Sequence, residues 1–230
     1  MSESRRFRVL KRQLRRVRGG KGLPAVPEGR AGVMMIGHRD YIGGRWDEIG
    51  ELQFNFLVGR GLRPDNVFLD IACGSLRAGV HLIPYLDPGN YLGIEKEKVL
   101  VNRGLTKELS AEVREEKRPE LVVSDSFEFE RFSKQADYSI AHSLFSHLNA
   151  SDTERCLSNL RSYAPPQHQL FATFILGSSN DNAGRSHSRE AFRFSVDELA
   201  AVGTCNGWQC EYLGEWGHPD GQVMMQFTAA

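Results

Sequence analysis

Four of the five histidines in the second half of the chain are our candidates for proton transfer near neutral pH. They are His142, His147, His187 and His218, and the imidazole is the side chain that titrates most readily in this range. His142 directly follows a predicted strand, and His147 lies about one and a half turns into a predicted helix beyond it. A general base is needed only if the reacting substrate must lose a proton. We therefore expect His142 or His147 to be catalytic in that case, with His187 and His218 as further candidates.

Three acidic side chains stand at or near the ends of predicted strands. They are Asp70, Glu95 and Asp125, and the small-residue run 72–75 lies between the first two. Small residues let the backbone approach a ligand closely. Glu95 follows Gly74 by 21 residues, a spacing that suits a carboxylate accepting hydrogen bonds from ribose hydroxyls. The pattern favours a nucleotide-like ligand, although a surface glutamate and a helix-capping aspartate are the alternative interpretations.

Alternating strands and helices are needed to bring these groups together. The predicted strands cover residues 67–71, 91–94, 121–123, 136–141, 169–176, 209–213 and 223–227. Helical spacing predicts helices from Trp46 to Leu57, over 97–118, over 152–163 and from Ser195, where Glu198 completes a capping box. A short apolar run such as 67–71 suits a parallel strand covered on both faces. A strand, a tight turn and a helix together are typical of the ligand-binding end of a doubly wound sheet.

The stretch LDIACGSLRAG, residues 69–79, resembles the first motif of class I S-adenosylmethionine (SAM)-dependent methyltransferases. It keeps the middle glycine of that motif, Gly74, but has Ala72 and Leu76 at the other two glycine positions. The residues after the third strand, 124–127, resemble the third motif, in which an aspartate binds the adenine amino group. The end of the fourth strand, at Ala141 and His142, resembles the fourth motif, which abuts the transferable methyl group.

The resemblance covers about residues 45–230 and implies SAM as the cofactor. It also implies a single α/β domain with a doubly wound, seven-stranded, mostly parallel sheet and a final antiparallel strand. The residues that it implies at the cofactor are Tyr41, Trp46, Asp70, Ala72, Cys73, Gly74, Arg77, Glu95, Asp125, Ser126, Phe127, Ala141 and His142. For Tyr41 and Trp46, the two interpretations are a lid over the cofactor and packing on the hydrophobic core. For Arg77, they are an ion pair with the cofactor carboxylate and a surface capping role.

The net charge of zero hides a strong asymmetry. Residues 1–18 hold eight Lys/Arg and one acidic residue, which leaves 21 basic and 28 acidic residues, net −7, in the rest of the chain. We expect a basic arm and linker over residues 1–32 and a methyltransferase domain over 33–230. The arm is a solvated or subunit-packing segment, as in a homodimer, or touches an anionic surface. The net negative charge of the residues after 18 argues against a broad nucleic-acid-binding surface.

Several absences narrow the function. The four cysteines form no metal-binding spacing, no acidic or histidine cluster suggests a metal, and no apolar run approaches the ~20 residues that span a bilayer. The basic start has no apolar core behind it, so we expect no secretory signal and a cytoplasmic protein with free thiols. We expect methyl transfer to a small-molecule or glycan acceptor, at a hydroxyl oxygen. The alternatives are an RNA or protein acceptor held by the arm, a non-catalytic nucleotide-binding module, and an NAD(P) oxidoreductase, which lacks its GxGxxG motif here.

Overall fold

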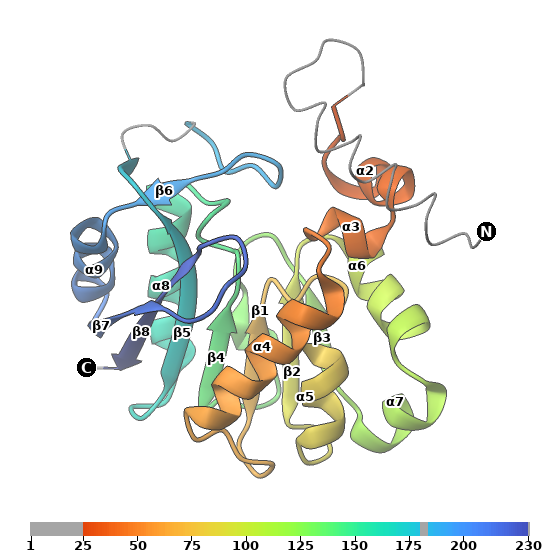
Figure 1. The fold of residues 1–230 in the computed structure, drawn as a ribbon. Coiled ribbons are helices and arrows are strands. Elements are labelled where there is room, and N and C mark those ends of the chain that lie inside the picture. The colour runs from red at the N-terminus through yellow and green to blue at the C-terminus, as the bar shows by residue number, and fades with distance from the viewer. Residues whose placement is uncertain (1–24, 180–183, 230) are drawn as a thin grey trace.

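A single twisted sheet with helices on both faces forms the body of the molecule (Figure 1). The computed structural model describes residues 25–179 and 184–229. Its strands are β1 (Phe68–Ile71), β2 (Tyr91–Glu95), β3 (Glu120–Val123), β4 (Tyr138–Ala141), β5 (Gln169–Leu176), β6 (Arg193–Phe194), β7 (Trp208–Glu215) and β8 (Val223–Ala229). Its helices are α2 (Gly29–Ile36), α3 (His38–Tyr41), α4 (Trp46–Gly59), α5 (Gly79–Tyr85), α6 (Lys98–Arg103), α7 (Ala111–Lys117), α8 (Ala150–Tyr163) and α9 (Val196–Cys205), with a π-helix over Gly104–Glu108 and a 3-10 turn over Phe129–Arg131.

The strand order is β3-β2-β1-β4-β5-β8-β7. Strands β1 to β5 are parallel to one another, whereas β8 is antiparallel to both β5 and β7. The predicted doubly wound sheet with a final antiparallel strand is therefore confirmed. One short strand was not predicted, because β6 contributes only two residues beside the end of β5.

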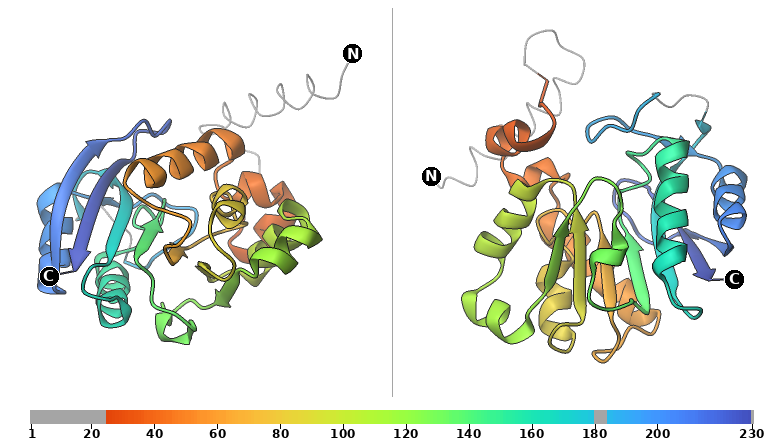
Figure 2. Two further views of the ribbon diagram at one scale, coloured as in Figure 1. Left: turned by 90° about the horizontal axis from the view of Figure 1, so that it is seen from below. Right: turned by 180° about the vertical axis from the view of Figure 1, so that it is seen from behind.

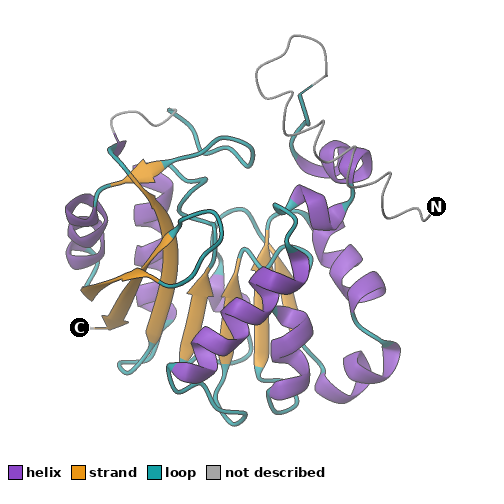
Figure 3. Cartoon of the chain, viewed as in Figure 1, coloured by secondary structure: helices purple, strands orange, loops and turns teal. Residues whose placement is uncertain are grey.

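Helices lie on both faces of the sheet, as Figures 2 and 3 show. Successive residues of a strand point to opposite faces, and all four residues of β1 are buried. Leu69 belongs to a core cluster with Leu157 of α8, and Phe68 belongs to a second cluster with Leu82 of α5. Helices α4 and α5 thus cover one face, while α8 and α9 cover the other.

A third, smaller cluster lies above the carboxyl ends of the parallel strands. Val33 of α2 and Tyr41 of α3 pack there against Leu100 of α6, and Figure 1 shows α2 and α3 at this end of the sheet. The predicted boundary between arm and domain, at residue 33, falls within α2. Residues 1–24, which include the basic stretch 1–18, lie outside the described residues, so the role of the arm stays a prediction.

One predicted helix and the predicted place of His147 were wrong in detail. The helix predicted over 97–118 is split into α6, the π-helix and α7. A Cβ on Gly104 would lie 2.7 Å from the Leu76 Cγ atom and 2.8 Å from the Ser75 carbonyl oxygen, so the chain passes very close to the turn after β1. A π-helix often marks such a functional region.

The second correction concerns His147. Residues 142–148 form turns, and α8 begins only at Ala150, where the Asn149 side chain accepts a hydrogen bond from the Asp152 backbone N–H. His147 therefore lies in the connection between β4 and α8 and not within a helix. The capping box of α9 is confirmed, since Ser195 and Glu198 each accept from the other's backbone N–H. No helix within the described ranges is long and apolar enough to cross a membrane.

Candidate cofactor and acceptor site

The turn after β1 has the backbone shape that glycines usually supply. Ala72, Gly74 and Leu76 have φ values of 60°, 57° and 67°, in the left-handed region that side chains with a Cβ atom adopt only at a cost. Phe127 and Ser143, after β3 and β4, also have positive φ values of 57° and 55°. Strained backbone of this kind gathers at functional sites. The strand ends of this sheet therefore have the backbone signature of a binding site.

Leu76 occupies the place of the third motif glycine because two other glycines make room for it. It is fully buried. A Cβ on Gly79 would lie 2.9 Å from the Leu76 Cβ, and a Cβ on Gly104 would lie 2.7 Å from the Leu76 Cγ. Contacts under 3.0 Å are essentially absent between real Cβ atoms and their neighbours. The turn is therefore closely packed although Leu76 stands at the third glycine position, because the neighbouring positions 79 and 104 are glycines.

Glu95 ends β2 beside this turn, as predicted. One carboxylate oxygen accepts a hydrogen bond from the Gly74 backbone N–H at 3.0 Å, and the other accepts from the Glu97 N–H at 2.9 Å. Burial raises the pKa of Glu95, while these two hydrogen bonds oppose the increase. A carboxylate offers about four lone-pair positions, so Glu95 can accept two further hydrogen bonds. That capacity fits the two hydroxyls of a ribose.

Asp70 and Cys73 are both buried beside the turn. Asp70 is buried, and the Tyr91 hydroxyl donates a hydrogen bond of 2.7 Å to its carboxylate. Burial raises the pKa of Asp70 to about 7, although the Tyr91 hydrogen bond opposes it, and burial also raises the pKa of the Cys73 thiol. Tyr91 is the partner that a buried strand-end carboxylate requires. Direct contact of Asp70 or Cys73 with a cofactor stays a prediction.

The residues after β3 divide into exposed polar groups and a half-buried ring. Asp125 and Ser126 are exposed, and the Ser126 hydroxyl donates to the Asp125 carboxylate at 2.9 Å. Phe127 packs against the core, and the Arg155 guanidinium lies 5.6 Å from its ring centroid. The two polar side chains are placed for an external ligand, whereas one contact of the Phe127 ring is already made within the chain.

A buried cluster of polar and aromatic side chains follows β4. Ala141 ends the strand, and His142 comes next with 8% of its surface exposed. The His142 Nδ1 atom is 3.1 Å from the Arg77 Nη2 atom, and its Nε2 atom is 3.1 Å from the His218 Nε2 atom. Trp216 contacts both imidazoles, with ring centroids 5.9 Å from His142 and 5.6 Å from His218. Burial lowers the pKa of His142 well below its ordinary value, and Arg77 adds to this.

Arg77 is a buried residue that ties three segments together. One terminal nitrogen donates to the backbone carbonyls of Ile42 and Gly44, at 3.2 Å and 3.0 Å, and the other donates to His142. Burial lowers its pKa to about 10. Only 6% of Arg77 is exposed, so the expectation that it caps the surface was wrong. Its buried Nε atom has no hydrogen-bond partner within the described residues, which leaves a donor for a ligand.

His147 and His187 have different hydrogen-bonding states from His142. The His147 Nδ1 atom is 2.7 Å from the Glu190 carbonyl oxygen and must donate to it, which leaves Nε2 as an acceptor. The His187 Nδ1 atom accepts from the Arg189 N–H, and its Nε2 atom is 3.3 Å from the Glu28 carboxylate. Of these two residues, His147 therefore keeps the lone pair that a general base needs. Burial lowers the pKa of His147.

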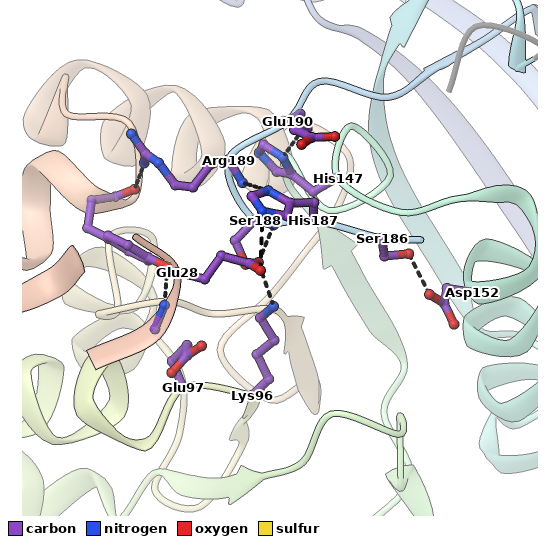
Figure 4. A network of polar contacts seen from close by, with 12 residues as sticks. Glu28, Lys96, Glu97, His147, Asp152, Ser186, His187, Ser188, Arg189 and Glu190 are labelled. Carbon is purple, nitrogen blue, oxygen red and sulfur yellow. Dashed lines mark hydrogen bonds and ion pairs between the residues drawn. The ribbon is translucent and has the colours of Figure 1, made fainter. Parts of the chain in front are cut away.

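Figure 4 shows the polar contacts that join the segment before α2 to the segment before β6. Glu28 accepts a hydrogen bond of 2.8 Å from the Ser188 N–H and lies 3.8 Å from the Lys96 Nζ atom. Arg189 donates to the Tyr41 carbonyl oxygen at 3.0 Å and lies over the Tyr41 ring. These residues are far apart in sequence but meet above the strand ends. We call this set of contacts the latch.

Tyr41 and Trp46 are buried parts of the segment that carries the latch. The Tyr41 hydroxyl accepts from the Gly29 N–H, and the Trp46 ring lies 4.6 Å from the Arg39 guanidinium. Between them, Ile42 contacts the turn after β1, because a Cβ on Gly74 would be 3.3 Å from the Ile42 Cγ2 atom. The segment thus lies on the turn, but closure of Tyr41 or Trp46 over a cofactor stays a prediction.

The sequence alone did not reveal the contacts that hold the cluster in place. Thr173 of β5 donates to Gln222, Gln222 donates to the Ser143 hydroxyl, and the Ser143 N–H donates to Thr173, each at 2.7 Å. Trp216 donates to the Gln222 carbonyl oxygen. These residues carry no motif, and their pairing depends on the β7–β8 connection folding over β4. Within the described residues, no three His, Cys, Asp or Glu side chains gather in a way that could hold a metal ion.

The fold is that of class I SAM-dependent methyltransferases, which confirms the predicted resemblance at the level of fold. The magnesium protoporphyrin IX methyltransferase of Synechocystis, solved with SAM, matches 96% of this chain and 91% of its own at 14% identity and a TM-score of 0.61. A glycopeptide N-methyltransferase complexed with SAM matches 79% and 94% at 13% identity and a TM-score of 0.61. A SAM-dependent methyltransferase from Clostridium acetobutylicum matches 82% and 93% at 7% identity and a TM-score of 0.62. Comparisons with family models and with curated proteins find no match.

Proposed function

We propose that the protein is a SAM-dependent methyltransferase that transfers the methyl group to an oxygen of a small-molecule acceptor. The observation that carries this proposal is the turn after β1. It keeps positive φ values at Ala72, Gly74 and Leu76 although only one of these residues is glycine. Glu95 is bonded to the same turn and has acceptor capacity left. A fold that had lost its nucleotide ligand would have no reason to retain this strain.

The residues around the turn fit the parts of SAM. Glu95 would accept the ribose hydroxyls, the exposed Asp125 and Ser126 would meet the adenine, and the unpartnered Nε atom of Arg77 would donate to the carboxylate. When bound, SAM supplies a methyl group that is already activated by its sulfonium. The chain then has to orient the acceptor and exclude water. The latch residues above the strand ends support this second task.

The proposed class of methyl acceptor is supported by the neighbours in fold and by the hydrogen bonding of His147. Neighbours in fold include a magnesium protoporphyrin IX methyltransferase, a glycopeptide N-methyltransferase and a methyltransferase in calicheamicin biosynthesis, all named for small or peptide-based acceptors. Where the acceptor is a neutral hydroxyl, His147 is the histidine with a free lone pair to take its proton. We also propose a reducing, cytoplasmic location, which four free cysteines support.

Calorimetric titration of the purified protein with SAM, S-adenosylhomocysteine (SAH) and NAD tests the cofactor. We expect micromolar binding of SAM and SAH and none of NAD. Glu95→Ala should weaken SAM binding by roughly 1–3 kcal/mol, because ribose hydroxyls would lose their acceptor. Glu112→Ala, on the exposed face of α7, is the matched control and should bind SAM as the wild type does. Wild-type affinity in Glu95→Ala refutes the ribose assignment, and binding of NAD alone refutes the cofactor.

A further inference from the structure

His142 and His218 meet through their Nε2 atoms, and the Trp216 ring contacts both. His142 follows β4, whereas His218 comes from the connection between β7 and β8. The two Nε2 atoms are 3.1 Å apart, and the ring centroids are separated by 5.1 Å. Each histidine is only 8% exposed. A contact of this length between two nitrogens is favourable only if one donates a proton and the other accepts it.

The outer nitrogen of each ring already accepts a hydrogen bond. Arg77 reaches the His142 Nδ1 atom at 3.1 Å, and the Asp220 backbone N–H reaches the His218 Nδ1 atom at 3.2 Å. A guanidinium and a backbone N–H can only donate, so both Nδ1 atoms must carry a lone pair. A neutral imidazole with a lone pair on Nδ1 has its proton on Nε2.

Both inner nitrogens therefore carry a hydrogen, and neither can accept from the other. Protonating either ring would not help, since an imidazolium has no acceptor at all. Burial and the Arg77 charge also oppose a second proton on His142. Among the described residues, neither Nε2 atom contacts a hydrogen-bond acceptor other than the facing ring, and buried donors are almost always satisfied. An external acceptor atom that lies to one side of the pair, within hydrogen-bond distance of both Nε2 atoms, would satisfy both.

We propose that His142 and His218 form a two-donor site for one anionic oxygen of the methyl-accepting substrate. This inference rests on the proposed methyltransferase function and narrows its substrate class. Two N–H donors, one of them on a ring whose Nδ1 atom is bonded to the Arg77 guanidinium, suit an oxygen that already bears negative charge, as in a carboxylate or an acidic phenol. Such an acceptor needs no base, because it has no proton to lose. His142 then binds the acceptor and does not act as the general base.

The tautomers can be read directly from two-bond proton–nitrogen NMR spectra of the 15N-labelled full chain at neutral pH. We expect both His142 and His218 to have the proton on Nε2. His168 is the internal control: its Nδ1 atom must donate to the Ala136 carbonyl oxygen at 2.7 Å, and its Nε2 atom accepts from the Ser139 hydroxyl. It should therefore show the opposite tautomer. A proton on Nδ1 of His142 or of His218 overturns the proposal.

Acetate is the minimal probe for the anionic oxygen. Titration with sodium acetate should move the Nε2 signals of both rings in a saturable manner, while acetamide should bind at least about tenfold more weakly because it carries no charge. Sodium chloride at equal ionic strength controls for salt, and His168 should not respond. The proposal is overturned if acetate moves neither ring, or if chloride has the same effect as acetate.

Substitution of one donor completes the test. His218→Phe keeps a ring against Trp216 and should weaken the acetate response at His142 by about tenfold, the cost of one hydrogen bond to a charged acceptor. His81→Phe, on α5, should leave the response unchanged. Should His218→Phe fail to fold, the contact between the two rings in the wild-type spectrum identifies their signals and the acetate titration still decides.

The test is separable from that of the proposed function, because it is made on the protein without cofactor. SAM binding without an acetate response overturns only the two-donor site and leaves the methyltransferase proposal in place. An acetate response without SAM binding refutes the cofactor and retains an anion site of another function. An acceptor screen with matched pairs of carboxylic acids and primary alcohols should then give turnover only with the acids.

Discussion

Replacing Ala72 with glycine should reveal how much strain the turn after β1 stores. Ala72 has a φ of 60°, where a Cβ atom costs roughly 1–2 kcal/mol that glycine does not incur. Glycine also gives the unfolded chain more freedom, which lowers stability by about 0.4–1 kcal/mol. Ala72→Gly should therefore be close to neutral or stabilising by up to about 1 kcal/mol.

Ala78→Gly is the matched control, six residues along the same segment. Ala78 has a φ of −78° and a ψ of −33°, which alanine adopts freely, and it is 3% exposed. There glycine brings the entropy cost and the loss of a buried methyl group worth about 0.8 kcal/mol, with no strain to relieve. We expect Ala78→Gly to lose roughly 1–2 kcal/mol. The two variants should thus differ by about 2 kcal/mol, or about 4–8 °C in melting temperature for a chain of this size.

Denaturant unfolding with an unchanged slope measures both variants on one scale. The reasoning is refuted if Ala72→Gly is as destabilised as Ala78→Gly, because a strained alanine cannot lose as much as a relaxed one. SAM affinity provides a second readout. Because glycine can hold the same backbone conformation, Ala72→Gly should bind SAM within about twofold of the wild type.

Two further predictions concern charge and closure. Because burial raises the pKa of Asp70 to about 7, the folded chain holds its proton more tightly than the unfolded chain, and wild-type stability should fall as pH rises from about 4 to 7. The side chain introduced by Asp70→Asn does not titrate, so the stability of this variant relative to wild type should improve by about 4 kcal/mol between pH 4 and pH 8. Urea unfolding at each pH measures this difference, and a difference that stays constant with pH contradicts the raised pKa of Asp70. Arg189→Ala removes the latch contacts to Tyr41 and should speed SAH release roughly two- to fivefold in stopped-flow experiments, since an exposed pair of this kind contributes at most about 1 kcal/mol. Arg185→Ala is the control from the same segment. An equal increase in the rate of SAH release in that variant would refute the role of the latch.

The parts of the fold that were predictable depend on local patterns. Short apolar runs identified seven of the strands, and the residues 195–198 identified the capping box of α9. Glu95 was found because its place at the end of β2 follows from the spacing after Gly74. Such features are encoded within a few consecutive residues, or within one strand–turn–helix unit.

The parts that escaped prediction depend on residues far apart in sequence. The π-helix arises where Gly104 meets the turn near Ser75, and nothing within 97–118 indicates that approach. Glu28 and Ser188 are 160 residues apart, so the latch has no local pattern. The tautomer of His142 depends on Arg77 and His218, and a histidine in a sequence says nothing about which nitrogen carries the proton.

Because Leu76 packs between Gly79 and Gly104, the residues at these three positions can be exchanged only together. Restoring glycine at 76 alone would leave a void, and adding a side chain at 79 or 104 alone would force a collision. A turn transplanted from a protein of the same fold would therefore succeed only with all three positions changed together. Redesign of the candidate site should keep these three residues and vary the residues after β4 instead.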